Sequence, residues 1–323
     1  MSDFRTTFTI PPHPTSFSHK EGILLIGSCF SESIGSLLQH HKIPTLINPV
    51  GTLFNPISIF KAIEFSLGIT TPTTTFNTLQ QGTWYHYQTH SIIKGKTENE
   101  LNNNLIKALK NTQEFNKSAK TLIITFGTSF VYEHITSGEI VANCHKTPQK
   151  NFKKRLLTHE EITTAFEQLY PHLTSFENII FTLSPVRHTK DTIPLNSVSK
   201  SILRVVCHEL QEKYTNVTYF PSYELLMDDL RDYRFYKDDF IHPTDFAVNY
   251  VWEKFQQTYF TEHTQSLLKE INNIQQSLAH RPFNIETEAF LKFQNQLLEK
   301  MQKLNDDVDF NSEIEEIKKL FLV

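Results

Sequence analysis

Ile23-Leu24-Leu25-Ile26-Gly27-Ser28-Cys29-Phe30 is the stretch around which the chain is organised. Its first four residues are continuously apolar, as in a strand buried on both faces of a parallel sheet. From Phe30 the apolar residues recur at helical spacing, which predicts an amphipathic helix. Ser28 therefore lies in a turn between a strand and a helix. In open α/β sheets ligands bind at such turns, next to a helix N-terminus that favours negative charge.

A serine hydroxyl in this turn is well placed to act as a nucleophile if a base lies nearby. Two structural roles compete with that function, because Ser28 can be the N-cap of the helix and Gly27 can serve only to permit the turn. Cys29 follows directly. We interpret it as a buried packing residue rather than an alternative nucleophile.

Composition and charge restrict the class of protein. The chain has 323 residues, of which 39% are hydrophobic, and its net charge of -4 leaves no basic surplus for nucleic acid or an anionic membrane surface. No apolar run approaches the ~18 residues that a membrane span needs, and residues 1–7 lack the pattern of a secretory signal. Three widely spaced cysteines fit a reducing compartment. We expect a cytoplasmic protein.

Apolar runs alternate with helical patterns along most of the chain. The predicted strands are residues 23–26, 43–48, 121–126, 179–183 and 217–220. The predicted helices are residues 30–42, 56–67, 101–116, 158–174, 196–213 and 246–259. Such alternation indicates an α/β fold in which helices cover both faces of a parallel sheet.

We expect an α/β domain over residues 1–262 and a helical extension over 263–323, with helices at 267–274, 290–304 and 314–321. Residues 1–21 contain four prolines and read as an extended surface arm. Hairpins are expected as insertions near 72–96 and 133–155. The helical extension would pack on the domain or form an interface in a homo-oligomer.

Asp239-Phe240-Ile241-His242 places a carboxylate three residues before a histidine, in a loop ahead of the last helix of the domain. With Ser28, these residues would supply a nucleophile, a general base and a carboxylate that orients the imidazole. Asp238 is an alternative to Asp239, since a loop can present either carboxylate. The three-residue spacing favours Asp239.

The order and spacing of these residues resemble the SGNH/GDSL hydrolase superfamily, and longer motifs resemble the GSCFA family within it more closely. The motifs that carry this resemblance are residues 27–30, 48–56, 125–128, 141–146, 184–188, 229–236 and 242–243. The similarity extends over roughly residues 20–290. It implies a three-layer α/β/α sandwich with a parallel five-stranded sheet and, by superfamily analogy, hydrolysis or transfer of an acyl ester.

The resemblance also implies roles for individual residues. Ser28 would be the nucleophile and, through its N–H, an oxyanion donor, and the N–H of Gly51 would join the same oxyanion hole. The superfamily has an asparagine donor after its third strand, where this chain has Gly127-Thr128-Ser129. A Thr128 or Ser129 hydroxyl would then replace that donor, at a cost in rate.

Asn55, His145, Arg187 and His188 are the candidate substrate-binding residues, although each could instead serve only the structure. Arg187 is the strongest of the four, because its planar guanidinium matches a carboxylate or phosphate. Lys146, beside His145, is a weaker candidate. His86 and His90 are four residues apart but lack the remaining features of a zinc motif. We expect no metal and no cofactor.

These residues together predict a serine-dependent acyl-ester hydrolase or O-acyltransferase for a small polar substrate, such as an acetylated sugar. Two other classes of protein stay open. One is a metal-dependent phosphoesterase that uses the aspartates between residues 228 and 239 with nearby histidines. The other is a non-catalytic binding or assembly protein built on a degraded hydrolase pocket.

Overall fold

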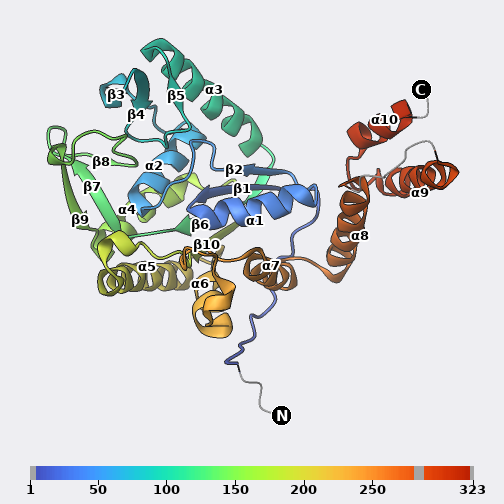
Figure 1. Ribbon diagram of the computed structural model, residues 1–323. Helices are drawn as coiled ribbons and strands as arrows, with labels where there is room; N and C mark the ends of the chain where they lie inside the picture. Colours follow the sequence, from blue (N-terminus) through green and yellow to red (C-terminus); the bar gives the residue numbers. More distant parts are fainter. Residues whose placement is uncertain (1–4, 280–286, 321–323) are drawn as a thin grey trace. The chain divides into compact units, whose positions relative to one another are not determined.

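A computed structural model describes residues 5–279 and 287–320 of the chain (Figure 1). The chain divides into two compact units. The first comprises Met1–Thr9, Gly22–Gly35 and Thr45–Glu253, and the second Ile10–Glu21, Ser36–Pro44 and Lys254–Val323. Residues 1–4, part of the segment tested for a secretory signal, lie outside the described residues, as does the expected helix end at 321.

The first unit is built on a five-stranded parallel sheet with the strand order β11-β10-β6-β1-β2. The strands are β1 (Gly22–Gly27), β2 (Thr45–Ile47), β6 (Ala119–Phe126), β10 (Asn178–Leu183) and β11 (Val217–Phe220). Every residue of β1 and β10 is buried, as the apolar runs predict for central strands. The expected α/β/α sandwich with a parallel five-stranded sheet is confirmed.

Between and after the strands of this sheet, the chain forms six α-helices longer than one turn and one short helix. They are α1 (Cys29–His40), α2 (Pro56–Leu67), α3 (Glu98–Asn116), α4 (His159–Leu169), α5 (Ile193–Lys213), α6 (Ser222–Glu224) and α7 (Asp245–Tyr259). Capping residues fix where several of these helices begin. Asn55 caps α2 with Pro56 at its first position, and Thr158 forms a capping box with Glu161 at the start of α4.

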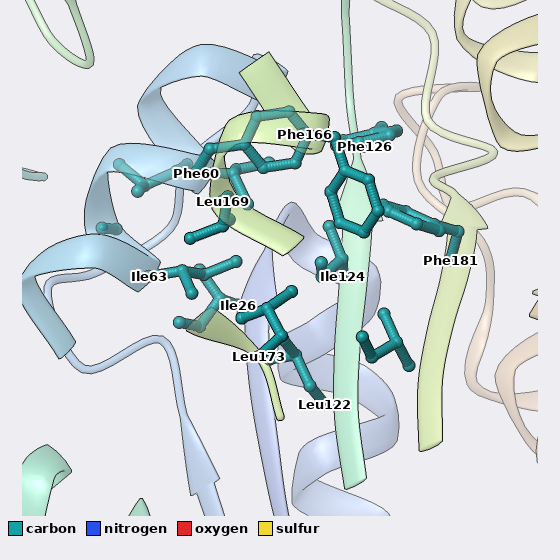
Figure 2. Packing of buried hydrophobic residues seen from close by; sticks show 14 of the residues in the cluster. Ile26, Phe60, Ile63, Leu122, Ile124, Phe126, Phe166, Leu169, Leu173 and Phe181 are labelled. Atoms are coloured by element: carbon teal, nitrogen blue, oxygen red, sulfur yellow. The ribbon is translucent and has the colours of Figure 1, made fainter. Parts of the chain in front are cut away.

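The main core lies between one face of the sheet and helices α2, α4 and α5. Alternate strand residues such as Ile26, Leu122 and Ile124 point to this face, as the two-residue period of a strand requires. Phe166 of α4 packs in the middle, with its ring centroid 5.6 Å from Phe60 of α2 and 5.1 Å from Phe181 of β10. Figure 2 shows these rings side by side.

Two antiparallel sheets interrupt the α/β alternation. The first contains β3 (Asn77–Gln80), β4 (Thr83–His86) and β5 (Lys94–Gly95), and the second contains β7 (Phe130–His134), β8 (Ile140–Val141) and β9 (Phe152–Leu156). Both lie where the sequence suggests inserted hairpins. Tyr87 and Val141 form a small apolar cluster with Phe152.

The acidic segment after β11 has regular secondary structure. It forms a π-helical turn over Leu225–Leu230, and Asp229 within this turn is 2% exposed. Asp229 accepts hydrogen bonds from Arg5 (2.6 Å) and from the Tyr250 hydroxyl of α7 (2.5 Å). The negative charges of this motif are therefore divided between a buried structural network and the site described below.

In the second unit, the helices after α7 are α8 (Glu262–Ala279), α9 (Glu288–Leu304) and α10 (Asn311–Leu320). The arm before β1 packs through Phe17, which is 1% exposed and whose ring stacks on Tyr259 with centroids 5.1 Å apart. Lys42 pairs with Glu313 at 2.6 Å. Among the residues described, no helix is long and apolar enough to cross a membrane.

Candidate active site

The turn after β1 takes its shape from Gly27. Gly27 has a φ of 146°, and a Cβ atom at this position would lie 2.2 Å from the carbonyl oxygen of Thr125 in β6. Only glycine tolerates both constraints. The Ser28 N–H donates a hydrogen bond to the same Thr125 oxygen (3.0 Å), and α1 begins at the next residue, Cys29.

Ser28 and Cys29 lie in different surroundings. Ser28 is 1% exposed, and among the described residues its hydroxyl has no hydrogen-bond partner, so it does not cap α1. Cys29 is half-buried and lines a cavity of about 560 Å³ at the carboxyl ends of the strands. The two expectations for the turn, Ser28 as nucleophile and Cys29 as a packing residue, stay predictions. The strand-to-helix transition thus buries Ser28 and places Cys29 on the cavity wall.

His242 lines the same cavity and is paired with Asp239. The imidazole Nδ1 lies 2.6 Å from Asp239 Oδ2, while Asp239 Oδ1 accepts the N–H groups of Ile241 and His242 at 2.9 Å. Because a carboxylate only accepts hydrogen bonds, the proton of the imidazole is on Nδ1 and Nε2 is the free basic nitrogen. The loop therefore places the imidazole next to the carboxylate that orients it.

The hydrogen bonds to Asp239 keep it ionised. The backbone N–H of His242, its imidazole and the N–H of Ile241 together lower the pKa of Asp239 to about 2. A permanent carboxylate charge beside Nδ1 fixes the orientation of the ring and stabilises an imidazolium.

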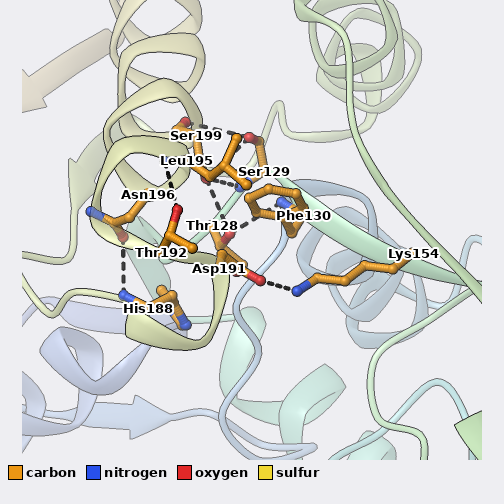
Figure 3. A network of polar contacts seen from close by, with 10 residues as sticks. All are labelled: Thr128, Ser129, Phe130, Lys154, His188, Asp191, Thr192, Leu195, Asn196 and Ser199. Carbon is orange, nitrogen blue, oxygen red and sulfur yellow. Dashed lines mark hydrogen bonds and ion pairs between the residues drawn. The ribbon is translucent and has the colours of Figure 1, made fainter.

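The expected oxyanion donors are used elsewhere in the fold. The Gly51 N–H donates to Asn48 O (2.7 Å), as the Ser28 N–H does to Thr125 O. The Ser129 hydroxyl is fully buried against Ser199, at 3.1 Å from its Oγ (Figure 3). Each of these donors meets an acceptor in the neighbouring strand, turn or helix, so none of the three is available to a ligand in the cavity.

Thr128 does line the cavity, but its hydroxyl is already engaged. Thr128 Oγ1 lies 3.1 Å from Ser199 Oγ and accepts the N–H of Phe130 at 3.1 Å (Figure 3). The hydroxyl therefore ties the end of β6 to helix α5. Another backbone donor is closer to the thiol. The Cys29 N–H is the first of α1, where helical N–H groups have no intrahelical acceptor.

Asn55 is both a helix cap and a cavity residue. Its Oδ1 accepts the N–H of Ser58 (2.9 Å), and its Nδ2 donates to the Ser58 hydroxyl (3.0 Å). A side-chain amide has two N–H groups, so the second one remains for a ligand on the cavity wall that Asn55 shares with Cys29. Asn55 is predicted from the sequence as a substrate-binding residue, and the structure places it on the cavity wall.

Arg187 and His188 also line the cavity, as expected from the end of β10. Burial, with the positive charges of Lys200 and Lys154, lowers the pKa of His188 to about 4, so its imidazole is neutral at pH 7. The His188 N–H donates to Asn196 Oδ1 of α5 (3.0 Å), as Figure 3 shows. Arg187 additionally lines an adjacent cavity of about 400 Å³.

His145, predicted from the sequence as a substrate-binding residue, does not line this cavity. Its Nε2 is hydrogen-bonded to His86 O (2.9 Å), and its ring stacks on Tyr85 with centroids 4.8 Å apart. The hairpin motif instead contributes Asn143 and Cys144 to the wall. The backbone of His145 has a φ of 47°, in the left-handed region that few non-glycine residues adopt.

Three charged residues near the cavity are absent from the sequence prediction. Lys154 of β9 forms an ion pair with Asp191 on the cavity wall (Figure 3). Lys200 of α5 is 2% exposed. Lys200 does leave a signal in the sequence, because it falls three residues before Leu203 and seven before Cys207, on the apolar face of its helix.

No group of three or more His, Cys, Asp or Glu side chains that could hold a metal ion occurs within residues 5–279 and 287–320. His86 is instead a buried residue of β4, with Nε2 at 3.1 Å from Thr73 O. The aspartates of the 228–239 segment are separated, since Asp229 joins Arg5 and Asp239 joins His242.

Fold and site together define an α/β/α protein with a thiol and an aspartate-bound histidine on the walls of one cavity. The chain belongs to the GSCFA family, whose family model matches residues 22–255. The model described as GSCFA domain protein, C-terminal domain, matches residues 271–321. A comparison with curated proteins gave no match.

Proposed function

We propose that the protein is an acyl-ester hydrolase or O-acyltransferase for a small polar substrate, with Cys29 as its nucleophile. His242 is the general base and Asp239 its orienting carboxylate. The observation that carries this proposal is that Cys29 and the Asp239-bound His242 line one cavity, whereas the Ser28 hydroxyl is buried. The resemblance to SGNH hydrolases supports the reaction class, with a thiol in place of the expected serine hydroxyl.

The first half of the reaction forms a thioester. Burial and the carboxylate of Glu32 raise the pKa of the Cys29 thiol, so a base must remove its proton during attack. His242 Nε2 accepts that proton as the sulfur attacks the ester carbonyl. The imidazolium then returns the proton to the leaving alcohol, and an acyl group remains on Cys29.

The second half transfers the acyl group from Cys29. His242 deprotonates a water molecule or a second alcohol, which attacks the thioester carbonyl and releases the thiol. During both halves, the Cys29 N–H at the start of α1 and the free N–H of Asn55 Nδ2 hold the oxyanion. Both groups replace the donors that the sequence had suggested.

The cavity matches a small acyl ester. A volume of about 560 Å³ lies within the range for small-molecule sites. Its wall combines the aromatic side chains of Phe130 and Tyr132 with the polar side chains of Arg187 and His188, which suits a short acyl chain and a polar alcohol. A nucleophilic thiol must stay reduced, so we propose the cytoplasm as its compartment; Cys29, Cys144 and Cys207 are all free.

The test compares turnover of p-nitrophenyl acetate, butyrate and octanoate by wild type, Cys29→Ala, Ser28→Ala and His242→Ala. We expect Cys29→Ala and His242→Ala to lose at least about 10²-fold in kcat/KM, as loss of a nucleophile or base does. Ser28→Ala is the matched control from the same turn and should keep wild-type turnover.

Three results would contradict the proposal. Loss of turnover in Ser28→Ala, with turnover retained in Cys29→Ala, would return the nucleophile to the serine. Inhibition of the wild type by EDTA would favour the metal-dependent phosphoesterase. No turnover of any ester, together with no mass increase of Cys29 after incubation with the p-nitrophenyl esters, would favour a non-catalytic binding protein.

A further inference from the structure

A second cavity lies beside the one that Cys29 and His242 line. Its volume is about 400 Å³, and Arg187 lines both cavities. The rest of its wall comes from the segment after β11, between residues 223 and 236. The reaction outlined above uses no residue of this segment, so the second cavity has a role still to be assigned.

The wall of the second cavity is connected to the loop that carries His242. Tyr236, on this wall, forms an isolated β-bridge with Pro243, and the N–H of the next residue, Lys237, donates to His242 O (2.8 Å). The alcohol released from the ester takes its proton from His242, so its oxygen must lie within reach of this imidazole. The second cavity is thus placed to receive the rest of the alcohol.

Two exposed aromatic rings continue this connection at the surface. Tyr233 lines the second cavity and is 65% exposed, and its ring centroid is 6.0 Å from that of Phe240, which stands between Asp239 and His242 in the sequence. Phe240 is 60% exposed and has a φ of 55°, a left-handed conformation that is rare for a bulky residue. Adjacent exposed rings and a strained backbone are typical of a ligand-binding surface.

The polar side chains of the second cavity carry both signs of charge. Arg187 and Arg231 are positive, and Asp228 and Asp232 are negative. In the described part of the chain, no ion pair joins either arginine to a carboxylate, and Arg187 Nη2 contacts Met227 Sδ at 3.6 Å. An anionic ligand would face the two aspartates, and a cationic ligand would face the two arginines. A neutral polyol matches both, because each hydroxyl donates and accepts.

We propose that the second cavity binds the alcohol part of the substrate, and that this alcohol is a sugar. Its ring hydroxyls accept hydrogen bonds from Arg187 and Arg231 and donate to the two aspartates, while its C–H groups pack on the ring of Tyr233. When the ester C–O bond breaks, the acyl carbon stays on Cys29 and the sugar oxygen takes the proton of His242. This inference rests on the proposed function and names the class of its substrate.

Isothermal titration calorimetry tests this site without ester turnover. The probes are glucose, cellobiose, xylobiose and N,N′-diacetylchitobiose, with inorganic phosphate as the anionic alternative. We expect at least one sugar to bind the wild type. Its Kd should weaken about tenfold or more in Arg187→Met and in Tyr233→Ala, as loss of a charged hydrogen-bond donor or an aromatic contact does. Phe246→Ala removes a ring of α7 that is 67% exposed and lines neither cavity, and it should keep the wild-type Kd.

Three results would overturn the proposal: binding of none of the four sugars, binding of phosphate alone, or a sugar Kd that is unchanged in Tyr233→Ala. Because Tyr233 is exposed, its variant keeps the test valid even if Arg187→Met does not fold.

Ester kinetics then show whether the bound sugar is the reacting alcohol. The ratio of kcat/KM for acetylated cellobiose to that for p-nitrophenyl acetate should fall about tenfold in Tyr233→Ala and stay at the wild-type value in Phe246→Ala. Turnover of p-nitrophenyl acetate without binding of any sugar would overturn the sugar site and leave the proposed function intact. Sugar binding that depends on Tyr233, without turnover of any ester, would instead contradict the proposed function and support the sugar site.

Discussion

Asp239 and His242 form their pair on a short, exposed loop rather than in a buried cleft. About half of each side chain is exposed (46% and 45%), so the surroundings contribute little desolvation. The geometry is maintained locally, because Asp239 Oδ1 accepts two backbone N–H groups of the same turn. A loop of four residues is thus sufficient to orient an imidazole without support from a distant element.

Asp239→Asn tests this local pair. Asparagine is neutral and its amide can donate to Nδ1 of His242, which favours the wrong tautomer of the imidazole. We therefore expect kcat to fall by about 10²- to 10⁴-fold. Asp238→Asn, one residue earlier, is the matched control and should change kcat little. Equal losses in the two variants would contradict the assignment of Asp239.

The pH profile of the wild type gives a second measure of the same pair. Since the pKa of Asp239 is lowered to about 2, its carboxylate is ionised over the whole range above pH 4. The support that it gives to His242 is lost only as the pH falls through about 2. Any loss of ester turnover between neutral pH and pH 4 must therefore report another group.

The sequence predicts this pair, but it does not show which residue of the turn after β1 lines the cavity. A spacing of three residues is enough to place Asp239 beside His242 within one turn. In contrast, Ser28 and Cys29 are adjacent, and which side chain reaches the cavity depends on where the strand ends and α1 begins. A boundary uncertain by one residue reverses the two environments, so only the structure distinguishes them.

At the scale of elements, the start of α2 shows how one residue serves stability and chemistry together. Asn55 satisfies the N–H of Ser58 as a helix cap, and its amide also forms part of the cavity wall. The sequence indicates this start well, since Asn55-Pro56 precedes an apolar helical pattern. It gives no comparable sign of the π-helical turn at Leu225–Leu230, within which Asp229 bonds the distant Arg5.

Two substitutions separate the roles of Asn55. Asn55→Asp keeps a side-chain acceptor for the cap but loses the amide N–H, so stability should hold while kcat falls about 10²- to 10³-fold. Asn55→Ala should lose the same activity and also about 1 kcal/mol in the free energy of unfolding measured in urea. Thr158→Ala, at the cap of α4, is the control.

In that control we expect a similar loss of stability with ester turnover retained, because Thr158 caps α4 through Glu161 N–H at 3.2 Å and does not line the cavity. Wild-type kcat in Asn55→Asp would contradict the role of Asn55 in holding the oxyanion. Capping of α2 would then be the whole function of Asn55.

Over the whole molecule, buried neutral histidines are a shared feature of both units. Burial lowers the pKa of His86 and of His188 to about 4 in the first unit. It also lowers the pKa of His19 and of His41 in the second. Each imidazole is bound in its neutral form. His86, for example, accepts the N–H of Gln88 at Nδ1 (3.2 Å) and has Nε2 near Thr73 O.

These histidines predict that the protein loses stability in mild acid. The unfolded chain binds protons at the ordinary histidine pKa of 6.5, whereas folded His86 and His188 bind them only near 4. The free energy of unfolding should therefore be fully retained above about pH 6.5 and fall as the pH drops toward 4, by about 3 kcal/mol for each of these two residues. Urea unfolding followed at successive pH values measures this dependence.

His86→Gln should reduce the slope of the unfolding free energy against pH in that window, while His208→Gln, which changes an exposed histidine of α5, should leave the slope unchanged. The same slope in wild type and His86→Gln would show that protonation of His86 does not limit stability, and the acid sensitivity would then have to come from the other buried imidazoles.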